Sequence, residues 1–408
     1  MAVKKKESKT ETTDGLREKF QQIMKIMSKH AIGQKALIEC LVLATLSGEH
    51  AIFIGPHGCN KTATIDMMAH LLGANKRASL MHNGRKHSEE ELKAASFTFF
   101  TTLDKYTTPD ALFGPYSLRA LKDDKWVRNL AGTMAEADLA YVGEIFSANG
   151  ATLRSMVRAL NEREVENGGE RIKLRLRSVF ADSNFESMEN TAAVFDRFLF
   201  RLPVTYLERN KKALFQGLMG SEPFDRELTQ PVLNIELLDA ARAAVQQIEI
   251  PSDMVESLYE LNNKIIAELK ITTLSDRRWR RCLNALRASA WLRGDSAVRP
   301  VDFYNALRFI MFDRMQHYSG LLELLEPYRQ LAASSNEDEV VAQCKTILDG
   351  VRGSDIAHIV QANLEIQKAA LLVTGKEASE HINKILEEIE TLMLNVEGNV
   401  EFEDEDIF

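Results

Sequence analysis

The stretch from residue 51 to residue 62 constrains the fold of this chain more than any other. An apolar run, Ala51-Ile52-Phe53-Ile54, is followed by Gly55-Pro56-His57-Gly58-Cys59-Asn60-Lys61-Thr62, and apolar residues then recur at helical spacing up to residue 72. This order predicts a buried strand, a glycine loop and a helix that begins at the loop. Backbone N–H groups of such a loop and of the first helical turn point at one place, so the stretch predicts an anion site suited to phosphate.

Residues 55–62, which we call the phosphate loop, also carry two side chains with the required chemistry. Lys61 is expected to reach the β- and γ-phosphates of a nucleotide, and the Thr62 hydroxyl is expected to bind Mg²⁺. Asn60 stands where the pattern has glycine, but asparagine tolerates unusual backbone angles better than most residues. Cys59 has two interpretations: a thiol with a pKa lowered by the helix N-terminus, or a small loop-filling residue, which we favour. A plain strand–turn–helix with a chance Lys-Thr pair is the alternative for the octet alone.

Further short apolar runs predict the rest of a sheet. They lie at residues 97–103, 139–142, 179–181 and 198–204, with helical segments between them. Alternation of short buried strands with helices favours a parallel sheet covered on both faces, that is, an α/β fold. Residues 168–177 alternate basic and apolar side chains, which suggests a hairpin arm. After about residue 207 the strand signal stops and the sequence is typical of helices.

The domain boundaries follow from these shifts in pattern. The chain of 408 residues is long enough for two to three domains. We expect a disordered basic leader at residues 1–15, an α/β nucleotide-binding domain at 16–207 and a linker at 208–231. A helical lid is expected at 232–318, a C-terminal helical domain for partner contact at 319–396 and an acidic tail at 397–408.

Composition and charge exclude several classes of protein. Apolar residues make up 45% and charged residues 27% of the chain, and no apolar run is long enough for a membrane span. The basic start lacks the apolar core of a secretory signal, and the four cysteines form no CxxC pair, so we expect a cytoplasmic, reduced protein. The net charge of −8 makes nucleic acid an unlikely partner. Most of that charge lies in the acidic residues 397–408, so nucleic acid is not excluded for the body of the chain.

Acidic and polar residues at the ends of later strands complete the predicted site. Glu144 ends the run 139–142 after one glycine and is suited to polarise an attacking water. Gly143 stands where an aspartate that helps to hold Mg²⁺ is usual. Asn184, just after the run 179–181, is suited to position that water or to sense the γ-phosphate. Arg197 lies in Phe-Asp-Arg-Phe, where a neighbouring subunit of a ring would receive it.

In this order, the motifs resemble the MoxR branch of the AAA+ ATPases, and most closely its RavA-type subgroup, over roughly residues 16–318. The resemblance rests on GPHGCNKT, YTTPDALFGPYSLRALK, YVGEIF, SANGATLRSMVRALNERE, NGGERIKLRLRS, SNF, FDRFLFRL and LSDRRWRRCLNALRASAWLRGDSAVRPVD. It implies Lys61 and Thr62 as the Walker A pair, Glu144 as the Walker B glutamate and Asn184 as sensor 1. It also implies Arg197 as the arginine finger, with Arg201 as the alternative, and Arg277 as sensor 2, with Arg278 not excluded.

The resemblance further implies cofactors and partners. The family uses ATP and Mg²⁺, forms hexameric rings and remodels protein partners, often proteins with von Willebrand factor A domains. Residues 113–137 and 168–177 look like the hairpin insertions of this branch. We therefore expect a chaperone-like ATP hydrolase that is slow or conditional because of Gly143, and we expect Gly143→Asp to raise turnover. The alternatives are a nucleotide-dependent scaffold with little hydrolysis and a motor stimulated by nucleic acid.

The stretch 74–95 is an insertion relative to the resembling family. His82 and His87 are five residues apart and acids follow at 89–91, but a metal site needs three or four converging ligands, so a solvated loop is favoured. Its basic residues are Lys76, Arg77, Arg85 and Lys86. They are suited to contact nucleic acid or an acidic partner, but because no aromatic residue accompanies them, a solvated surface is the better expectation. Ser88 and Glu91 have the spacing of a helix capping box.

Overall fold

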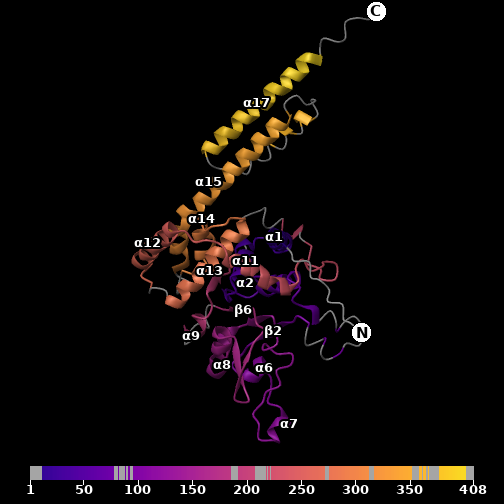
Figure 1. The fold of residues 1–408 in the computed structure, drawn as a ribbon, viewed down its shortest axis with the longest axis vertical. Coiled ribbons are helices and arrows are strands. Elements are labelled where there is room, and N and C mark those ends of the chain that lie inside the picture. Colours follow the sequence, from indigo (N-terminus) through magenta and orange to yellow (C-terminus); the bar gives the residue numbers. More distant parts are fainter. Residues whose placement is uncertain are drawn as a thin grey trace, which may run out of the picture. The chain divides into compact units, whose positions relative to one another are not determined.

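The computed structural model describes residues 12–77, 81, 88, 91, 95–184, 192–206, 217, 219–220, 222–271, 275–311, 317–351, 358–360, 362–363, 366 and 376–400. The chain divides into two compact units, residues 1–323 and 324–408. The first unit holds every strand of the described chain and the predicted site (Figure 1). His82, Arg85, Lys86, His87 and the acidic tail from residue 401 onward lie outside the described residues.

A five-stranded parallel sheet forms the centre of the first unit, in the order β2-β3-β6-β1-β7. Its strands are β1 (Ala51–Ile54), β2 (Thr98–Thr102), β3 (Leu139–Gly143), β6 (Ser178–Ser183) and β7 (Phe200–Pro203). All five lie within or next to the runs expected from the sequence, and the predicted α/β parallel-sheet class is confirmed. The parallel register aligns Val142 of β3 with Ala181 of β6, and Phe53 of β1 with Asp182 of β6.

Helices cover both faces of this sheet. On one face, Ile52 and Ile54 of β1 pack in a core with apolar residues of α6 (Pro109–Phe113) and α8 (Gly150–Asn161). The other face is covered by α2 (Lys35–Ser47), which contacts β1 and β7, and α3 (Lys61–Leu71), which contacts β3. Figure 1 shows α2 on one side of the strands and α6 and α8 on the other. Alternate side chains of β1, β3 and β6 are therefore buried on opposite faces, which explains their continuous apolar runs.

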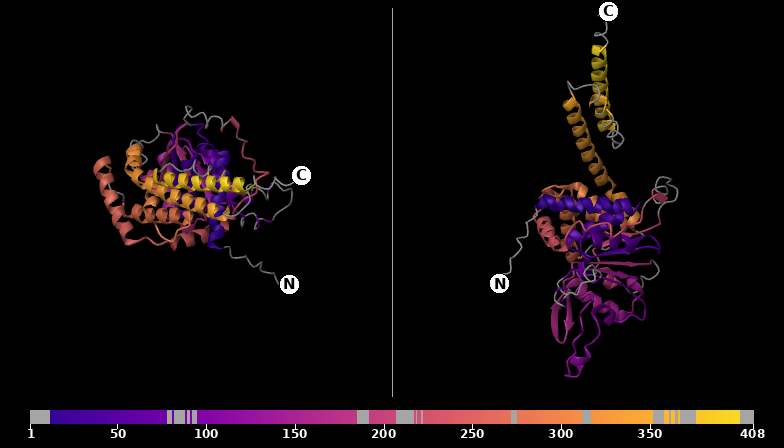
Figure 2. Two further views of the ribbon diagram at one scale, coloured as in Figure 1. Left: turned by 90° about the horizontal axis from the view of Figure 1, so that it is seen from above. Right: turned by 90° about the vertical axis from the view of Figure 1, so that its right-hand side faces the viewer.

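The helical part of the first unit packs against the N-terminal helix. It contains α11 (Leu238–Gln246), α12 (Ser252–Leu269), α13 (Asp276–Arg293), α14 (Pro300–Asp302) and a π-helix at Phe303–Leu307. The indigo helix α1 (Thr13–His30) lies beside these elements (Figure 2). Phe20 and Trp291 meet edge to face with ring centroids 6.0 Å apart, and Arg17 Nε donates to the Trp291 carbonyl at 2.8 Å. Because α1 begins at Thr13, residues 13–15 of the expected leader are helical.

Two arms extend from the sheet domain. The first, residues 114–131, carries the short helix α7 (Leu118–Leu121) at its tip, where Figure 1 shows it projecting. The second is the antiparallel hairpin β4 (Glu164–Asn167) and β5 (Glu170–Lys173), so the hairpin begins before the predicted range 168–177. The turn falls at Gly168 and Gly169, both at positive φ, because glycine adopts this backbone without strain. Gly168 N donates to Trp126 O at 3.0 Å, which joins the two arms.

A buried aspartate ties the second arm to the sheet. Asp138, fully buried just before β3, accepts from Phe97 N at 3.1 Å and pairs with Arg175 at 3.0 Å and with Arg177. Arg177 N in turn donates to Asp138 O at 2.7 Å, and its guanidinium also reaches Asp239 of α11 at 2.7 Å. The segment between the hairpin and β6 is thus fixed to the start of β3 by both backbone and side-chain bonds.

Among the described residues of the insertion 74–95, the basic side chain of Arg77 is not solvated as expected. Arg77 is buried, pairs with Glu136 at 3.1 Å and lies over the Phe97 ring at 4.8 Å. Its guanidinium is a packing element of the sheet domain, so the prediction of a basic surface is wrong for Arg77. Ser88 and Glu91 do exchange the two reciprocal bonds of a capping box, at 3.0 and 3.1 Å, as predicted.

The second unit has a core of its own. Its elements are the part of α15 (Tyr318–Val351) beyond residue 323 and α17 (Lys376–Val400). The predicted apolar stripe is buried at Ile382, Ile385 and Ile389, which pack with Val341, Cys344 and Leu348 of α15. Among the described helices of either unit, none combines the length and hydropathy needed to cross a membrane.

Candidate functional site

The phosphate loop joins β1 to α3 in the predicted order. Gly55 must be glycine, because a Cβ there would lie 1.9 Å from the Val204 carbonyl oxygen. Asn60 adopts the left-handed conformation with φ 57° and ψ 16°, which asparagine tolerates better than other side chains. Its carbonyl oxygen accepts from Thr64 N at 3.0 Å and from Thr64 Oγ1 at 2.8 Å, which starts α3. The substitution of asparagine for glycine therefore leaves the loop geometry intact.

Lys61 lies at the centre of the loop. Its Nζ donates to the carbonyl oxygens of Gly55 at 2.9 Å and of Pro56 at 2.8 Å, and it lies 3.7 Å from Asp182 Oδ2. The side chains of Lys61 and Asp182 are only 5% and 9% exposed, so their charges interact with little screening by solvent. An ammonium held at the mouth of the loop is placed to meet the phosphates of a nucleotide.

Thr62 and Tyr141 form the next contact outward. Their hydroxyl oxygens are 2.8 Å apart, and Tyr141 comes from β3, next to β6, the strand that carries Asp182. Burial raises the pKa of the Tyr141 phenol, and the neighbouring Asp182 and Glu144 carboxylates add to the rise. Tyr141 is therefore a neutral hydroxyl at any physiological pH, and it holds the Thr62 hydroxyl at the site expected for Mg²⁺.

Glu144 follows β3 in a left-handed conformation, with φ 50°. Its backbone N–H donates to Asp182 Oδ1 at 3.1 Å, and its carboxylate oxygen lies 3.5 Å from His57 Nδ1. Desolvation raises the pKa of Glu144, and the nearby negative charge of Asp182 raises it further. A carboxylate of raised pKa near a phosphate loop is suited to accept a proton from water.

Asn184 and His57 close the other side of the site. Asn184 Nδ2 lies 2.9 Å from His57 Nε2, and His57 O accepts from Tyr206 Oη at 2.9 Å. Because the amide N–H₂ of Asn184 is the donor, His57 Nε2 accepts and Nδ1 carries the hydrogen that faces Glu144. Asn184 Oδ1 is buried with no hydrogen-bond partner among the described residues, which leaves one acceptor for a bound group.

Burial distinguishes the two candidates for the arginine finger and the two candidates for sensor 2. Arg201 is 2% exposed, donates to the carbonyl oxygens of Phe195 and Phe198 at 3.1 Å each, and lies 4.0 Å over the Phe195 ring. Arg278 is 3% exposed and donates to Ile310 O at 2.7 Å. Both guanidinium groups bind backbone carbonyls inside the fold and are not available to a ligand in this arrangement.

Arg197 and Arg277 are the accessible members of those pairs. Among the contacts found in the described chain, the guanidinium of Arg197 bonds only its neighbour Asp196, at 2.9 Å, and its Nε has no acceptor there. Arg277 is exposed on α13 and reaches Asn161 Oδ1 at 3.3 Å. Neither contacts the phosphate loop, so the structure gathers Lys61, Thr62, Glu144 and Asn184 but leaves these two arginines apart from them.

Cys59 agrees with the loop-filling interpretation. The residue is 4% exposed, and desolvation raises the pKa of its thiol, with only a smaller opposing effect of Lys61. Its carbonyl oxygen accepts from Gln34 Nε2 of the segment before α2 at 3.2 Å. A thiol of raised pKa carries little thiolate and is a poor nucleophile.

The sequence did not predict the roles of Asp182 and Tyr141. It predicted His57 as a residue of the phosphate loop, but not its bridge between Asn184 and Glu144. Asp182 was visible as an acid at the end of an apolar run, the same signal that identified Glu144. Its neighbours depend on the sheet order, which places β6 between β3 and β1. The contact of Tyr141 with Thr62 joins residues 79 apart in the sequence, and that of His57 with Asn184 joins residues 127 apart, so no local pattern predicts either contact.

The oxygen ligands at this site suit a hard divalent cation. Thr62 and Asp182 supply a hydroxyl and a carboxylate beside an ammonium and an open phosphate loop, and Mg²⁺ prefers such oxygen ligands together with phosphates and water. The Lys61 ammonium at the phosphate loop is suited to the charge of a triphosphate, and the free acceptor Oδ1 of Asn184 is suited to a water molecule beside it. The residues present therefore fit Mg²⁺ and ATP.

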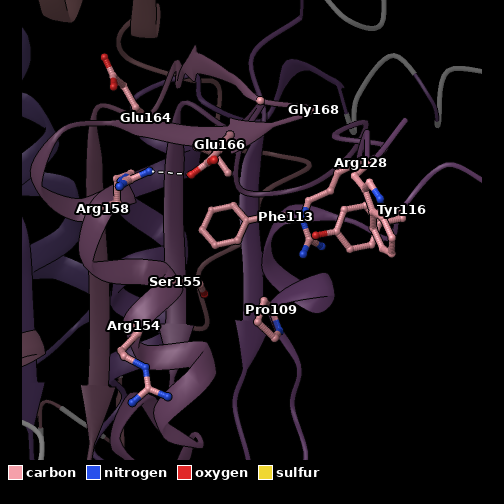
Figure 3. A pocket seen from close by; sticks show the side chains of 13 residues that line it. Pro109, Phe113, Tyr116, Arg128, Arg154, Ser155, Arg158, Glu164, Glu166 and Gly168 are labelled. Carbon is pink, nitrogen blue, oxygen red and sulfur yellow. Dashed lines mark hydrogen bonds and ion pairs between the residues drawn. The ribbon is translucent and has the colours of Figure 1, made fainter. Parts of the chain in front are cut away.

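A separate pocket of about 510 Å³ lies between the two arms and α8. Figure 3 shows Phe113 pointing into it, Arg158 paired with Glu166 on one side, and Tyr116 beside Arg128 on the other. Arg154, an exposed lining residue on α8, makes no ion pair within the part of the chain that the structure describes. The pocket combines aromatic surface with one uncompensated guanidinium and belongs to the projecting arms, not to the phosphate loop.

Comparisons with known proteins agree with this geometry. Residues 85–239 match a family model described as the MoxR domain in MoxR–vWA–β-propeller ternary systems, and residues 253–324 match an AAA lid domain. The phosphate loop precedes the first of these ranges. An uncharacterised protein of Methanocaldococcus jannaschii is 25% identical over 395 residues, which cover 93% of this chain and 97% of the relative.

Two further relatives carry informative names. Protein MoxR of Paracoccus denitrificans is 25% identical over 322 residues, 73% of this chain and 88% of its own length. The crystal structure of a candidate ATPase from Cytophaga hutchinsonii has a similar fold, with a TM-score of 0.58 and 16% identity, over 78% of this chain and 95% of that one. The chain is thus similar to the MoxR domain and to the AAA lid domain over the matched ranges, and it shares the fold of that solved structure.

Proposed function

We propose that this chain binds ATP with Mg²⁺ at the phosphate loop, hydrolyses it and uses the cycle to remodel or assemble a partner protein. The observation that carries the proposal is the convergence of Lys61, Glu144 and Asn184 at the carboxyl ends of β1, β3 and β6, with Asp182 between them. In an open parallel sheet this edge is where ligands bind.

The residues divide the work of hydrolysis. Lys61 neutralises phosphate charge, and the bound Mg²⁺ supplies further neutralisation of the transferring phosphoryl group. Glu144, with its raised pKa, accepts the proton of the attacking water, and His57 and Asn184 fix the position of the Glu144 carboxylate and of the water. Arg197 and Arg277, which lie away from the loop, act on a nucleotide bound at a subunit boundary of a ring, which we propose to be a hexamer.

The test is turnover and nucleotide binding of the wild type against Glu144→Gln. We expect turnover to fall about 10²–10⁴-fold, the contribution typical of a general base, while ATP affinity is retained. Equal release of phosphate by both proteins, with normal ATP binding, would instead support the alternative of a nucleotide-dependent scaffold, which Gly143 in place of an acid favours. Addition of DNA or RNA to the same assay tests the nucleic-acid motor, for which stimulation of turnover is required.

The partner is proposed to be a von Willebrand factor A protein that contacts the arm 114–131. The matched family model is named for systems that contain such proteins, and the RavA-type subgroup stays a prediction. Leu118 and Trp126 on this arm are 79% and 66% exposed, and large exposed apolar side chains gathered in one segment mark protein contacts. An acidic side chain beside an apolar one on the partner would satisfy both Arg154 and Trp126.

Co-purification of the two co-expressed proteins of one organism tests this surface. We expect Trp126→Ala and Arg154→Glu each to weaken capture while basal turnover stays unchanged. Val255→Ala, a substitution of another exposed apolar residue on α12, is the matched control and is expected to change neither. Full capture by the Trp126 and Arg154 variants would place the partner elsewhere.

A further inference from the structure

Position 143, where the resembling family has an acid, has little room for one. A Cβ on Gly143 would lie 3.0 Å from both Thr102 Oγ1 and Tyr141 Oη. Such contacts are tighter than van der Waals separation, so an aspartate here requires the neighbouring hydroxyls to move. The Tyr141 hydroxyl therefore lies beside the space that a side chain at position 143 would enter.

A carboxylate is present on the adjacent strand. Asp182 lies beside Gly143 because the parallel register pairs Val142 of β3 with Ala181 of β6, one residue earlier on each strand. Its Oδ2 is 3.7 Å from Lys61 Nζ and its Oδ1 accepts from Glu144 N at 3.1 Å. Asp182 therefore lies at the junction of the phosphate loop with the segment that carries the proposed base.

We propose that Asp182 supplies from β6 the carboxylate that acts on Mg²⁺, directly or through a water ligand, in place of an acid at position 143. This inference rests on the proposed function, because it concerns the metal that accompanies ATP. Tyr141 completes the arrangement by holding the Thr62 hydroxyl, the other protein oxygen directed at the metal. Mg²⁺ in nucleotide sites is commonly bound by only one or two protein carboxylates in addition to phosphates and water, so a single relocated acid is sufficient.

The competing explanation is that Asp182 only pairs with Lys61 and supports the loop. The two roles predict opposite responses to Asp182→Asn. If the carboxylate acts on the metal, the variant loses the enhancement of ATP binding by Mg²⁺, while metal-free ATP binds as well as before or tighter because a negative charge near the phosphates is gone. If it only supports the loop, ATP binding weakens equally with and without Mg²⁺.

The experiment measures binding of a fluorescent ATP analogue to the full chain in EDTA and across a Mg²⁺ titration, with Mn²⁺ electron paramagnetic resonance as a second readout. We expect Asp182→Asn to raise the apparent Kd for the metal about 10–100-fold, the loss typical of altered metal-site partners. Thr62→Ala is the positive control for metal loss. An unchanged metal affinity, or equal weakening in EDTA and Mg²⁺, would overturn the proposal.

A relocation variant tests the same proposal in a second way, by asking whether an acid on β3 replaces the one removed from β6. Asp182→Asn combined with Gly143→Asp in the Tyr141→Phe background returns the acid to β3 and removes one of the 3.0 Å contacts. Recovery of metal affinity toward that of Tyr141→Phe alone supports the proposal, and failure to recover in a folded protein counts against it. Absence of ATP binding in the wild type would refute the proposed function itself, which is a different result from any of these.

Discussion

Asp138→Ala tests whether the second arm is held to the sheet by a buried charge. Asp138 is fully buried and serves Arg175, Arg177 and Phe97 N. Loss of one partner of a buried ion pair costs about 3–5 kcal/mol because a charge remains without compensation. In the variant, Arg177 keeps its second carboxylate, Asp239, and the 41% exposed side chain of Arg175 is hydrated by solvent. We therefore expect a loss of stability at the low end of this range, about 3 kcal/mol.

Because the chain has two compact units, amide hydrogen exchange is a better assay than a single unfolding midpoint. A local loss of about 3 kcal/mol raises the opening constant roughly 150-fold, and it should appear at the amides of Phe97 and Arg177. Asp239→Ala is the matched control, since this carboxylate pairs with the same Arg177 but is 62% exposed and is expected to contribute about 0–1 kcal/mol. Equal protection in the two variants, or a change below threefold for Asp138→Ala, would refute the reasoning.

Three further outcomes follow from the site. Desolvation and the charge of Asp182 raise the pKa of Glu144, so turnover is expected to fall as pH falls through that raised pKa. Asp182→Asn should move this acidic limb of the kcat profile to lower pH. An unmoved limb would show that the Asp182 charge does not affect the group that titrates. Arg197→Ala should abolish phosphate release while fluorescent-nucleotide binding persists, whereas Arg201→Ala, which removes a buried guanidinium, should lower the melting temperature; similar stability losses for both would argue against the finger role. Asn60→Gly should preserve ATP binding, and Asn60→Val should weaken both binding and stability because a β-branched residue resists positive φ, as calorimetry would show.

The sheet and the core of the site were predictable because their signals are local. Apolar runs ending in Gly55, Glu144 and Asn184 identify strands whose carboxyl ends meet, without knowledge of any long-range contact. The hairpin was displaced in the prediction because β4 and β5 have little apolar alternation, while the decisive turn signal is the pair Gly168-Gly169.

The remaining features depend on neighbours that no local pattern reveals. Arg77 has the sequence of a surface cation, but Glu136 and Phe97 enclose it. Arg201 and Arg278 are equivalent to Arg197 and Arg277 by motif, and only their burial separates the pairs. The sequence alone predicts that Gly143→Asp raises turnover, because glycine stands where an aspartate is usual. With Asp182 beside position 143 and two hydroxyls 3.0 Å from its Cβ, we now expect no gain from the single substitution.

Strand β6 connects the β4–β5 hairpin to the phosphate loop. One end of the strand follows Arg177, whose backbone and side chain are fixed to Asp138, and the other end carries Asp182 and leads to Asn184. From residue 178 to residue 183 the strand spans five steps of about 3.3 Å, roughly 17 Å. It is buried along its whole length and bonded on both edges, so it resists bending and stretching. We therefore expect a displacement imposed on the β4–β5 hairpin to reach Asp182, and through it Lys61, only as a movement of β6 together with its neighbours β3 and β1.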